Sequence, residues 1–325
     1  MKEIKISIAM ATYNGEKYLQ EQLDSFVAQK TKPDELVVSD DCSTDKTIKI
    51  LKDFAKIAPF DVFIHENNVN LGYTGNFNKA LELTTGDIVF LSDQDDVWFQ
   101  NKIETILQLV RKKPNLFVYM NDALITDEKL QPVNLTKLGQ IKSAGLSENE
   151  FAMGCCCAIR KNFINIVLPI PTGLKSHDNW LVGIANGLNK KTISKSILQY
   201  YRRHNSNESQ YIANRVTKVN KWSSPWHIIK TSFTDKSNDK YLKSIEQAEI
   251  YILGLEKVKT NAPKTMICYF DEMIVIRQKR VSLLKSRLEV RNLNIFKRIP
   301  KALKLYYEKY PANYQLVNLI RDILG

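Results

Sequence analysis

Short β-branched runs alternate with helical stretches through residues 4–96, and this alternation most constrains what the chain can fold into. Leu19, Leu23 and Phe26, for example, recur at helical spacing after the first run. Strands that alternate with helices in this way are typical of parallel βαβ units. The pattern predicts an α/β domain whose mostly parallel sheet is flanked by helices, with strands at residues 5–10, 36–39, 61–65 and 87–92.

Polar residues stand where these predicted strands end. The groups in question are Tyr13-Asn14, Asp40-Asp41 and the tetrad Asp93-Gln94-Asp95-Asp96. In an open α/β sheet, ligands bind in the crevice beyond the carboxyl ends of the strands. Three carboxylates at one strand end suit Mg²⁺ or Mn²⁺ shared with a substrate phosphate. Considered alone, the tetrad is explained equally well by a solvated acidic turn or a helix N-cap.

Further helices and strands are predicted beyond residue 100. We expect a helix near residues 101–111 and strands at 116–125 and 193–201. Residues 131–149 are predicted to form a loop that is long enough to suggest a function. The segment Ser176-His177-Asp178-Asn179 opens another predicted helix.

Charge is distributed unevenly along the 325-residue chain, whose net charge is +12. Residues 1–210 carry 25 Lys and Arg against 25 Asp and Glu, whereas residues 211–325 carry 22 against 10. So sharp a change in composition predicts two domains, a neutral one at 1–210 and a basic one at 211–325 that suits an acidic partner.

Long helices are predicted for the basic domain. Its apolar residues recur at helical spacings, as in Tyr241, Ile245, Ala248, Ile252 and Leu255, then Ile267, Phe270 and Ile274, then Val281, Leu284 and Leu288. Something must cover these stripes. An intrachain helical bundle and an oligomer interface use the same packing, so both remain open.

The three consecutive cysteines at 155–157 make a poor disulfide framework and lack the spacing of a metal site. We expect the five cysteines to be small buried hydrophobic residues in a reducing compartment. No bilayer-spanning stretch or signal-peptide core is evident in the sequence, so we expect a cytoplasmic protein. The basic segment shows no groove-reading motif, and nucleic acid is therefore not an expected partner.

Five motifs in register resemble those of the family 2 glycosyltransferases, which have the GT-A fold. They are Ala11-Thr12-Tyr13-Asn14, Ser39-Asp40-Asp41-Cys42-Ser43-Thr44-Asp45, Asn70-Leu71-Gly72, Gly86-Asp87 and Ser92-Asp93-Gln94-Asp95-Asp96-Val97-Trp98. Two later motifs are similar to the rhamnosyltransferase-like branch: His177-Asp178-Asn179-Trp180 and Tyr201-Arg202-Arg203-His204-Asn205-Ser206-Asn207. The resemblance covers residues 1 to about 207, and no comparable match extends into the basic helices.

The resemblance implies a nucleotide-diphosphate sugar donor, with UDP favoured. Donor-binding positions carried over from the family are Ala11, Thr12 and Tyr13 in the base pocket, Asp41 for the uracil imide, Asn70 and Gly72 in a loop beside the donor, and Asp93 for the ribose. A carboxylate only accepts hydrogen bonds, so it fits an imide N–H. Several of these positions also have an ordinary explanation: Tyr13 could cover the core, Asp41 could cap a helix, and a turn alone would explain Asn70 and Gly72.

A divalent ion, Mn²⁺ or Mg²⁺, is the cofactor that the resemblance implies. Asp95 resembles the ligand between the donor phosphates, and His204 matches a late metal or diphosphate contact, since imidazole suits Mn²⁺. Arg202 and Arg203 are alternatives for holding the diphosphate. Asp96 is open between orienting the metal ligands, touching the sugar and capping the next helix.

Asp178 is the candidate general base of an inverting transfer, in which the acceptor hydroxyl displaces the nucleotide in one step. An N-cap role is its ordinary explanation, and both roles could hold together. Asn179 departs from the commoner motif, which has Trp there, and this alters the acceptor wall more than the chemistry.

The expected enzyme is a metal-dependent transferase that moves a hexose or N-acetylhexosamine from a UDP-sugar to a hydroxyl of a growing surface polysaccharide or glycoprotein. A dTDP-rhamnose-dependent rhamnosyltransferase and a non-catalytic glycan- or protein-binding scaffold are the alternatives. The acceptor is a glycan, a glycoprotein or a lipid-linked molecule. We expect the all-α domain at 211–325 to form a homo-oligomer or to bind the acceptor or the inner membrane surface.

Overall fold

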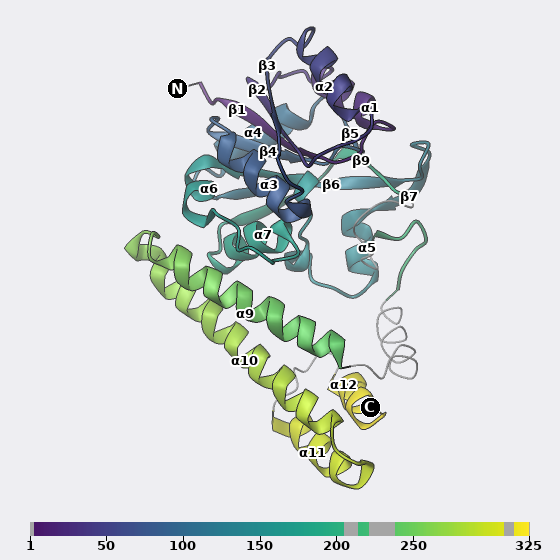
Figure 1. Cartoon of the computed structure of the whole chain (residues 1–325), viewed down its shortest axis with the longest axis vertical. Helices are drawn as coiled ribbons and strands as arrows, with labels where there is room; N and C mark the ends of the chain where they lie inside the picture. Colours follow the sequence, from purple (N-terminus) through teal and green to yellow (C-terminus); the bar gives the residue numbers. More distant parts are fainter. Residues whose placement is uncertain (1–2, 205–213, 221–237, 309–314, 325) are drawn as a thin grey trace. The chain divides into compact units, whose positions relative to one another are not determined.

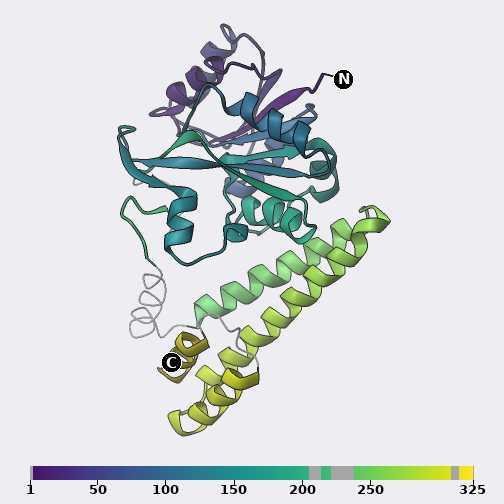
Figure 2. The same ribbon diagram turned by 180° about the vertical axis from the view of Figure 1, so that it is seen from behind.

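The computed structural model describes residues 3–204, 214–220, 238–308 and 315–324. The chain divides into two compact units, Met1–Lys142 with Ser147–Lys218, and Ser143–Leu146 with Val219–Gly325. The expected boundary between residues 210 and 211 lies outside the described residues. Figures 1 and 2 show a sheet with helices in the first unit and helices in the second.

A single mixed sheet organises the first unit (Figure 1). Its strands follow the order β3-β2-β1-β4-β8-β6-β9-β5, and β7 pairs with β6. In chain order they are β1 (Ile6–Thr12), β2 (Glu35–Asp40), β3 (Asp61–Glu66), β4 (Ile88–Ser92), β5 (Val97–Trp98), β6 (Val118–Thr126), β7 (Pro132–Thr136), β8 (Cys157–Arg160) and β9 (Lys191–Arg202).

The half of the sheet built from β3, β2, β1 and β4 is parallel, as the βαβ pattern predicts. In its register Thr12 lies beside Asp40, and Met10 lies beside Ser92. Because neighbouring parallel strands end on the same side, the segments that follow β1, β2 and β4 start at one edge. The polar groups seen in the sequence are therefore neighbours in the fold.

The other half of the sheet contains most of the antiparallel pairings. Strand β8 is antiparallel to β4 and β6, β7 to β6, and β5 to β9, whereas β9 runs parallel to β6. Strand β5 follows the acidic tetrad directly, and its Val97 pairs with Tyr200 near the end of β9. This pairing brings residues 202–204 back to the tetrad.

Helices cover the sheet of the first unit. They are α1 (Leu19–Val27), α2 (Thr47–Ala55), α3 (Gly72–Leu83), α4 (Lys102–Lys112), α5 (Lys137–Ser143), α6 (Lys161–Val167) and α7 (His177–Gly187). Leu23, Phe26 and Ile103 belong to one buried apolar cluster that α1, α2 and α4 share with β1, β2 and β4. Complete burial of each such side chain stabilises the fold by about 1.5–3 kcal/mol. Helix α3 packs on β1 and β2 and also contacts α7.

One local prediction is wrong. Residues 131–149 form β7 and α5 rather than a loop, since β7 pairs with β6 and α5 buries Leu138 and Ile141. Near the start of α2, the Ser43 hydroxyl donates to Asp40. Asp45 accepts from the backbone N–H of Thr47, at the first residue of the helix.

The cysteines are free thiols, and those at 155–157 are buried as expected. Burial raises the pKa of the Cys155 and Cys157 thiols well above the ordinary value, which keeps them protonated. Cys42 is partly exposed and Cys268 is exposed, so the expectation of burial is wrong for these two.

The described part of the second unit is helical. Its main helices are α9 (Asp239–Lys259), α10 (Ile267–Arg291), α11 (Ile295–Glu308) and α12 (Gln315–Leu324). Ile245 and Ala248 of α9 pack against Val281 of α10, so these predicted stripes cover each other within the chain. A buried ion pair joins the Arg287 guanidinium to Asp322 at 2.7 Å. None of the described helices is both long and apolar enough to traverse a lipid bilayer.

Candidate functional site

Carboxylates crowd together just beyond the end of β4. Burial, followed by the charges of Asp95 and Asp178, raises the pKa of Asp93 to about 7. The Tyr73 hydroxyl donates to Asp93 at 3.3 Å, and burial together with the Asp93 charge raises the pKa of that phenol well above its ordinary value. Like charges at short range oppose ionisation, so full ionisation of this cluster is electrostatically unfavourable.

Asp96 points into the protein, where its carboxylate is fully buried. Its two oxygens accept from the Gln199 side chain at 2.8 Å and from the Arg202 backbone N–H at 3.2 Å. Gln199 in turn accepts at 2.5 Å from Lys102, a buried ammonium whose pKa burial lowers to about 8. Burial and the charges of Asp95 and Asp93 raise the pKa of Asp96 well above its ordinary value. Asp96 therefore anchors the tetrad to β9 rather than capping a helix.

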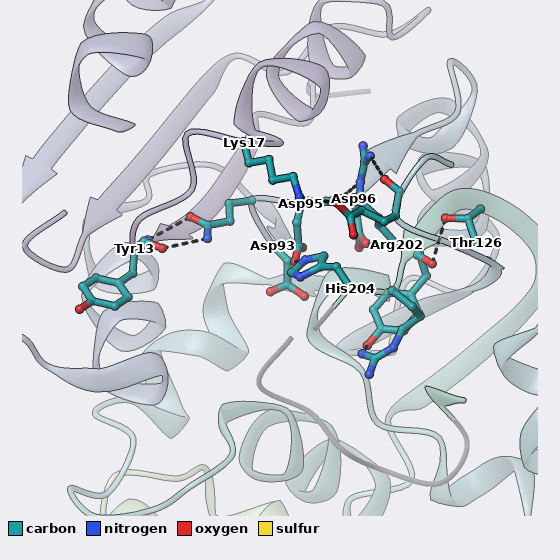
Figure 3. Close-up of polar contacts among 12 residues, drawn as sticks. Tyr13, Lys17, Asp93, Asp95, Asp96, Thr126, Arg202 and His204 are labelled. Carbon is teal, nitrogen blue, oxygen red and sulfur yellow. Dashed lines mark hydrogen bonds and ion pairs between the residues drawn. The ribbon is translucent and has the colours of Figure 1, made fainter. Parts of the chain in front are cut away.

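Asp95 faces His204 at the end of β9. Its Oδ2 lies 2.8 Å from Nε2 of His204, and the His204 ring packs 4.8 Å from the ring of Tyr18. Figure 3 shows Asp93, Asp95, Asp96 and His204 in one part of the site, with Tyr13 at its other end. The predicted pair of metal ligands is thus brought together by the β5–β9 pairing.

The donor atoms of this region fit a hard divalent cation. Asp93, Asp96 and Cys155 offer ligand atoms within 4.8 Å of one another. Both Asp96 oxygens already accept hydrogen bonds, however, and a protonated thiol is a soft and weak ligand, so this trio suits Mg²⁺ or Mn²⁺ poorly. Asp95 and His204, whose Oδ2 and Nε2 atoms lie 2.8 Å apart, supply a carboxylate oxygen and an imidazole nitrogen, which are ligand types that suit Mn²⁺ better.

Asp178 stands in the first turn of α7 and belongs to the same electrostatic cluster, since its charge acts on Asp93 and Tyr73. The helix cap is Ser176, whose hydroxyl accepts from the Asn179 N–H, so the ordinary explanation of Asp178 as the cap is wrong. Burial alone would raise the pKa of Asp178, but His177 and nearby backbone N–H groups hold it below the ordinary value. The carboxylate is therefore ionised at neutral pH, as a base must be.

His177 is the most unusual neighbour of Asp178. It is fully buried and stacks on Phe77 with ring centroids 4.0 Å apart, and its Nε2 lies 2.5 Å from Oδ1 of Asp178. Among the described residues, neither His177 nitrogen nor that carboxylate oxygen makes a hydrogen bond of good geometry. A Cβ at Gly154 would overlap this pair, so a glycine is required beside it. Unsatisfied buried polar atoms of this kind are found at functional sites.

Tyr13 presents its ring to solvent while its backbone is fixed. The side chain is 51% exposed, which leaves a face free for stacking. The Gln94 side chain accepts from the Tyr13 N–H at 3.0 Å and donates to the Tyr13 carbonyl at 3.0 Å (Figure 3). A Cβ at Gly15 would lie 2.6 Å from Cδ of Gln94, so this clamp also needs a glycine there.

Asp41 holds a loop. Its buried carboxylate accepts from the backbone N–H groups of Leu71 and Gly72 at 2.7 and 2.9 Å, and from the Asn67 side chain at 3.1 Å. Asn70 adds a hydrogen bond to the Asp41 carbonyl, so the predicted positions Asp41, Asn70 and Gly72 are brought together. Gly72 has a φ of +71°, a conformation that a glycine adopts without strain.

The other residues predicted to bind the sugar donor make most of their contacts with protein groups. Ala11 and Thr12 are buried at the end of β1, and the Thr12 hydroxyl donates to Asp40 at 2.7 Å. The buried Arg202 guanidinium donates to the carbonyls of Asp95 and Glu128 and to the Glu21 carboxylate, which indicates a scaffolding role. Arg203 donates to the Tyr201 hydroxyl at 3.0 Å.

Several residues of the site are missed by sequence reasoning. Gln94, Tyr73, Gln199 and Lys102 contact the predicted residues through side chains that no motif singles out. Gln94 lies inside the tetrad, so the sequence indicates that it is near the site but not that it contacts Tyr13. Lys102 opens an amphipathic helix, where a lysine is expected to be solvated.

The sequence model described as glycosyl transferase family 2 matches residues 7–166. The putative glycosyltransferase EpsE of Bacillus subtilis is 32% identical over 124 residues, which is 38% of this chain and 45% of that protein. The dTDP-rhamnosyl transferase RfbG of Shigella flexneri is 38% identical over 102 residues, 30% of this chain and 35% of that protein. The chain thus spans less than half the length of these curated relatives.

Solved structures of low sequence identity share the fold. TarS 1–349 of S. aureus in complex with UDP matches with a TM-score of 0.56 at 16% identity, covering 99% of this chain and 89% of that one. The mannosyltransferase PcManGT of Pyrobaculum calidifontis in complex with GDP-Man and Mn²⁺ matches with a TM-score of 0.50 at 14% identity, covering 100% and 86%. The predicted GT-A fold with an additional helical region is confirmed.

Proposed function

This chain belongs to glycosyl transferase family 2, matched through residues 7–166, and on that premise we propose that it transfers a sugar from a nucleotide-diphosphate donor to a hydroxyl of a growing glycan. The observation that carries the proposal is the cluster of Asp93, Asp95 and Asp178. It combines crowded carboxylates with an ionised carboxylate supplied from α7. Sugar transfer to a hydroxyl requires both of these features: negative charge that binds a cation, and a base that accepts the hydroxyl proton.

The transfer that these residues support is inverting. Asp178 takes the proton of the acceptor hydroxyl as its oxygen attacks the anomeric carbon from the face opposite the nucleotide. Asp95 and His204, with Asp93 beside them, would hold Mn²⁺ or Mg²⁺, which when bound neutralises the charge that develops on the leaving diphosphate. His177 keeps Asp178 ionised and in place. No residue needs to act as a covalent nucleophile.

The donor is bound at the other end of the site. Tyr13 stacks on the base with the ring that its fixed backbone presents, and Asp93 contacts the ribose. Ala11 and Thr12 form the floor of the base pocket. Asp41 retains its assignment to the uracil imide and also holds the loop of Asn70 and Gly72. Of the two arginines, we assign Arg203 to the diphosphate of the donor, because the Arg202 guanidinium donates to protein acceptors.

A UDP-hexose or UDP-N-acetylhexosamine is the donor that we propose. One relative, of Escherichia coli, is named as a UDP-Glc glucosyltransferase acting on a diphosphoundecaprenol-linked sugar, and it is 28% identical over 152 residues. A dTDP-rhamnose donor is the second candidate, because RfbG carries that donor in its name. Uracil and thymine share the imide that Asp41 would recognise, so that contact does not separate the two donors.

Thermal-shift measurements of the full chain test the donor assignment. UDP-glucose, UDP-N-acetylglucosamine and dTDP-rhamnose are each added with Mn²⁺, with EDTA and to the Asp95→Asn variant. A donor at 100 times its Kd stabilises the fold by about 2.7 kcal/mol. We expect one UDP-sugar to raise the Tm of wild-type protein with Mn²⁺, but not with EDTA and not in the Asp95→Asn variant. The matched control is Asp61→Asn, an exposed carboxylate at the start of β3, which should respond like wild type.

Donor hydrolysis separates the enzyme from the non-catalytic scaffold. An enzyme releases UDP slowly from its donor in the presence of Mn²⁺ because water can replace the acceptor. Binding of every donor without any UDP release, even with glycan acceptors added, would favour the scaffold.

We propose that the region from residue 211 onward mediates homo-oligomerisation and helps hold the acceptor. The stripes on α9 and α10 cover each other, which supports a bundle, while Leu253 and Ile276 remain exposed on these helices. Light scattering of the full chain checks the first part: a mass of one chain at all concentrations would contradict it.

A further inference from the structure

Helix α11 of the second unit has three distinct faces. A helix at the edge of a bundle needs only two, an apolar face toward the bundle and a polar face toward solvent. Each face is a row of residues three or four positions apart, so each row lies along one side of the helix. The rows are Arg298, Ala302 and Leu305; Phe296, Ile299, Leu303 and Tyr307; and Lys297, Lys301 and Lys304.

The row of Arg298, Ala302 and Leu305 faces the bundle. Ala302 and Leu305 are buried in a cluster with Val290 of α10. The Arg298 guanidinium donates to the carbonyls of Arg291 and Leu293 at 2.8 and 2.9 Å. The orientation of α11 within the second unit is thereby fixed.

The row of Phe296, Ile299, Leu303 and Tyr307 therefore faces outward, and we name it the apolar row. Phe296 is 86% exposed and Tyr307 is 79% exposed, with Ile299 and Leu303 exposed between them. Single exposed apolar residues are ordinary on protein surfaces, but four in register on one helix face form a continuous strip.

Lys297, Lys301 and Lys304, the lysine row, run along the side of this strip and are exposed. Lys304 is 3.9 Å from Glu308 at the end of the helix, a weak contact for an exposed pair. The second unit lies in the part of the chain that carries the whole net charge of +12. A surface that combines exposed apolar side chains with a row of cations fits a partner that is apolar beneath an anionic layer.

We propose that α11 binds the surface of an anionic lipid bilayer, with the apolar row inserted at the level of the acyl chains and the lysine row against the headgroup phosphates. Nucleic acid offers phosphates to the lysine row but no apolar layer to the apolar row, so it would contact only the lysine row. The proposal does not depend on the sugar-transfer chemistry, because α11 contains none of the residues assigned to it.

Vesicle co-sedimentation of the full chain tests this surface. Sucrose-loaded vesicles are made of phosphatidylcholine alone or mixed with phosphatidylglycerol. We expect binding to the anionic vesicles and little to the neutral ones. Replacing all three lysines of the row by glutamine should weaken binding on the order of a hundredfold. Replacing Phe296 and Tyr307 by serine should weaken it by about tenfold or more.

The matched controls alter the same residue types elsewhere in the second unit. A triple Lys→Gln variant at Lys243, Lys257 and Lys279 changes the net charge equally, and Leu253→Ser removes an apolar side chain that is 70% exposed on α9. Both should bind vesicles within about twofold of wild type. Circular dichroism and donor binding of each variant verify that the fold is retained.

Three results would overturn the proposal. Wild-type protein could fail to bind anionic vesicles, or the α11 variants could bind as tightly as their controls. In a third result, changes in the apolar row would dissociate an oligomer in light scattering and leave vesicle binding unchanged, which would assign the row to a second copy of the chain. Binding to a single-stranded oligonucleotide that the lysine variant loses, with no vesicle binding, would instead assign the lysine row to nucleic acid.

Discussion

Two acidic segments follow β2 and β4, the strands on either side of β1 in the same sheet, yet their carboxylates have different surroundings. Asp40 and Asp41, after β2, are surrounded by neutral donors: the Thr12 and Ser43 hydroxyls for Asp40, and the Leu71 and Gly72 N–H groups for Asp41. The tetrad after β4 instead places carboxylates close to one another, and burial together with the charges of Asp95 and Asp178 raises the pKa of Asp93 to about 7.

The difference separates carboxylates that neutral protein donors stabilise from carboxylates that lie close to other negative charges. Neutral donors satisfy the first pair within the protein, so no cation is needed there. In the tetrad, Asp96 accepts from Gln199 and Arg202, whereas Asp93 lies close to the like charges of Asp95 and Asp178. If this distinction is correct, substitutions in the tetrad should affect activity most and those at the end of β2 should affect stability most.

The largest effect is expected for Asp95→Asn. Removing one charge from the proposed metal site should lower Mn²⁺-dependent UDP release by about a thousandfold or more, since the cation stabilises the leaving diphosphate. Steady-state assays over a Mn²⁺ titration measure it, with Asp61→Asn as the control. Activity within tenfold of wild type at saturating Mn²⁺ would contradict the assignment of Asp95.

Asp178→Asn should remove the base and leave the donor site intact. We expect kcat for transfer to fall by about 10²–10⁴-fold while the Kd of the donor changes less than about twofold. Isothermal titration and turnover measured on the same preparation separate the two quantities. An equal loss of donor affinity would make Asp178 a donor ligand instead of the base.

Adding Mn²⁺ without any nucleotide should stabilise the protein, because the cation relieves the repulsion between Asp93 and Asp95. At 100 times its Kd the ion adds about 2.7 kcal/mol to the free energy of unfolding, which calorimetry detects as a rise in Tm. Asp95→Asn should lose this rise, and Asp41→Asn should keep it. A rise retained by Asp95→Asn would place the ion elsewhere.

Asp41→Asn should act on stability. The variant replaces a carboxylate that accepts from the Leu71 and Gly72 N–H groups, and one of these donors would then face an amide N–H. We expect the free energy of unfolding to fall by about 1–3 kcal/mol in urea titrations. An unchanged stability with a large loss of donor affinity would show that Asp41 works mainly in nucleotide recognition.

Gln94→Ala should produce the smallest effect. It removes two hydrogen bonds to the Tyr13 backbone, so the free energy of unfolding should fall by about 1 kcal/mol and KM for the donor should rise a few-fold with kcat little changed. Gln131→Ala, at an exposed position, is the control. A fall in kcat with an unchanged KM would indicate that Gln94 supports the acidic cluster rather than the base pocket.

Local patterns in the sequence determined the frame of the molecule. The strands β1, β2 and β4, the helices between them and the polar groups at their ends follow from short-range periodicity, which neighbouring residues alone encode. Asp93, Asp95, His204 and Asp178 were also predicted as a group, through motifs whose order could be followed along the chain. Even so, no distance between these residues follows from their order along the chain.

The tertiary structure alone decided what each carboxylate faces. Gln94 reaches Tyr13 across 81 positions, Lys102 reaches Gln199 across 97 and Gln199 reaches Asp96 across 103. Contacts so far apart in the chain depend on the strand order, above all on β9 returning beside β5, and side-chain hydrogen bonds are too short-ranged to be inferred before that order is known. The same holds for helix α11, because only its packing in the second unit shows which of its apolar residues remain exposed to solvent.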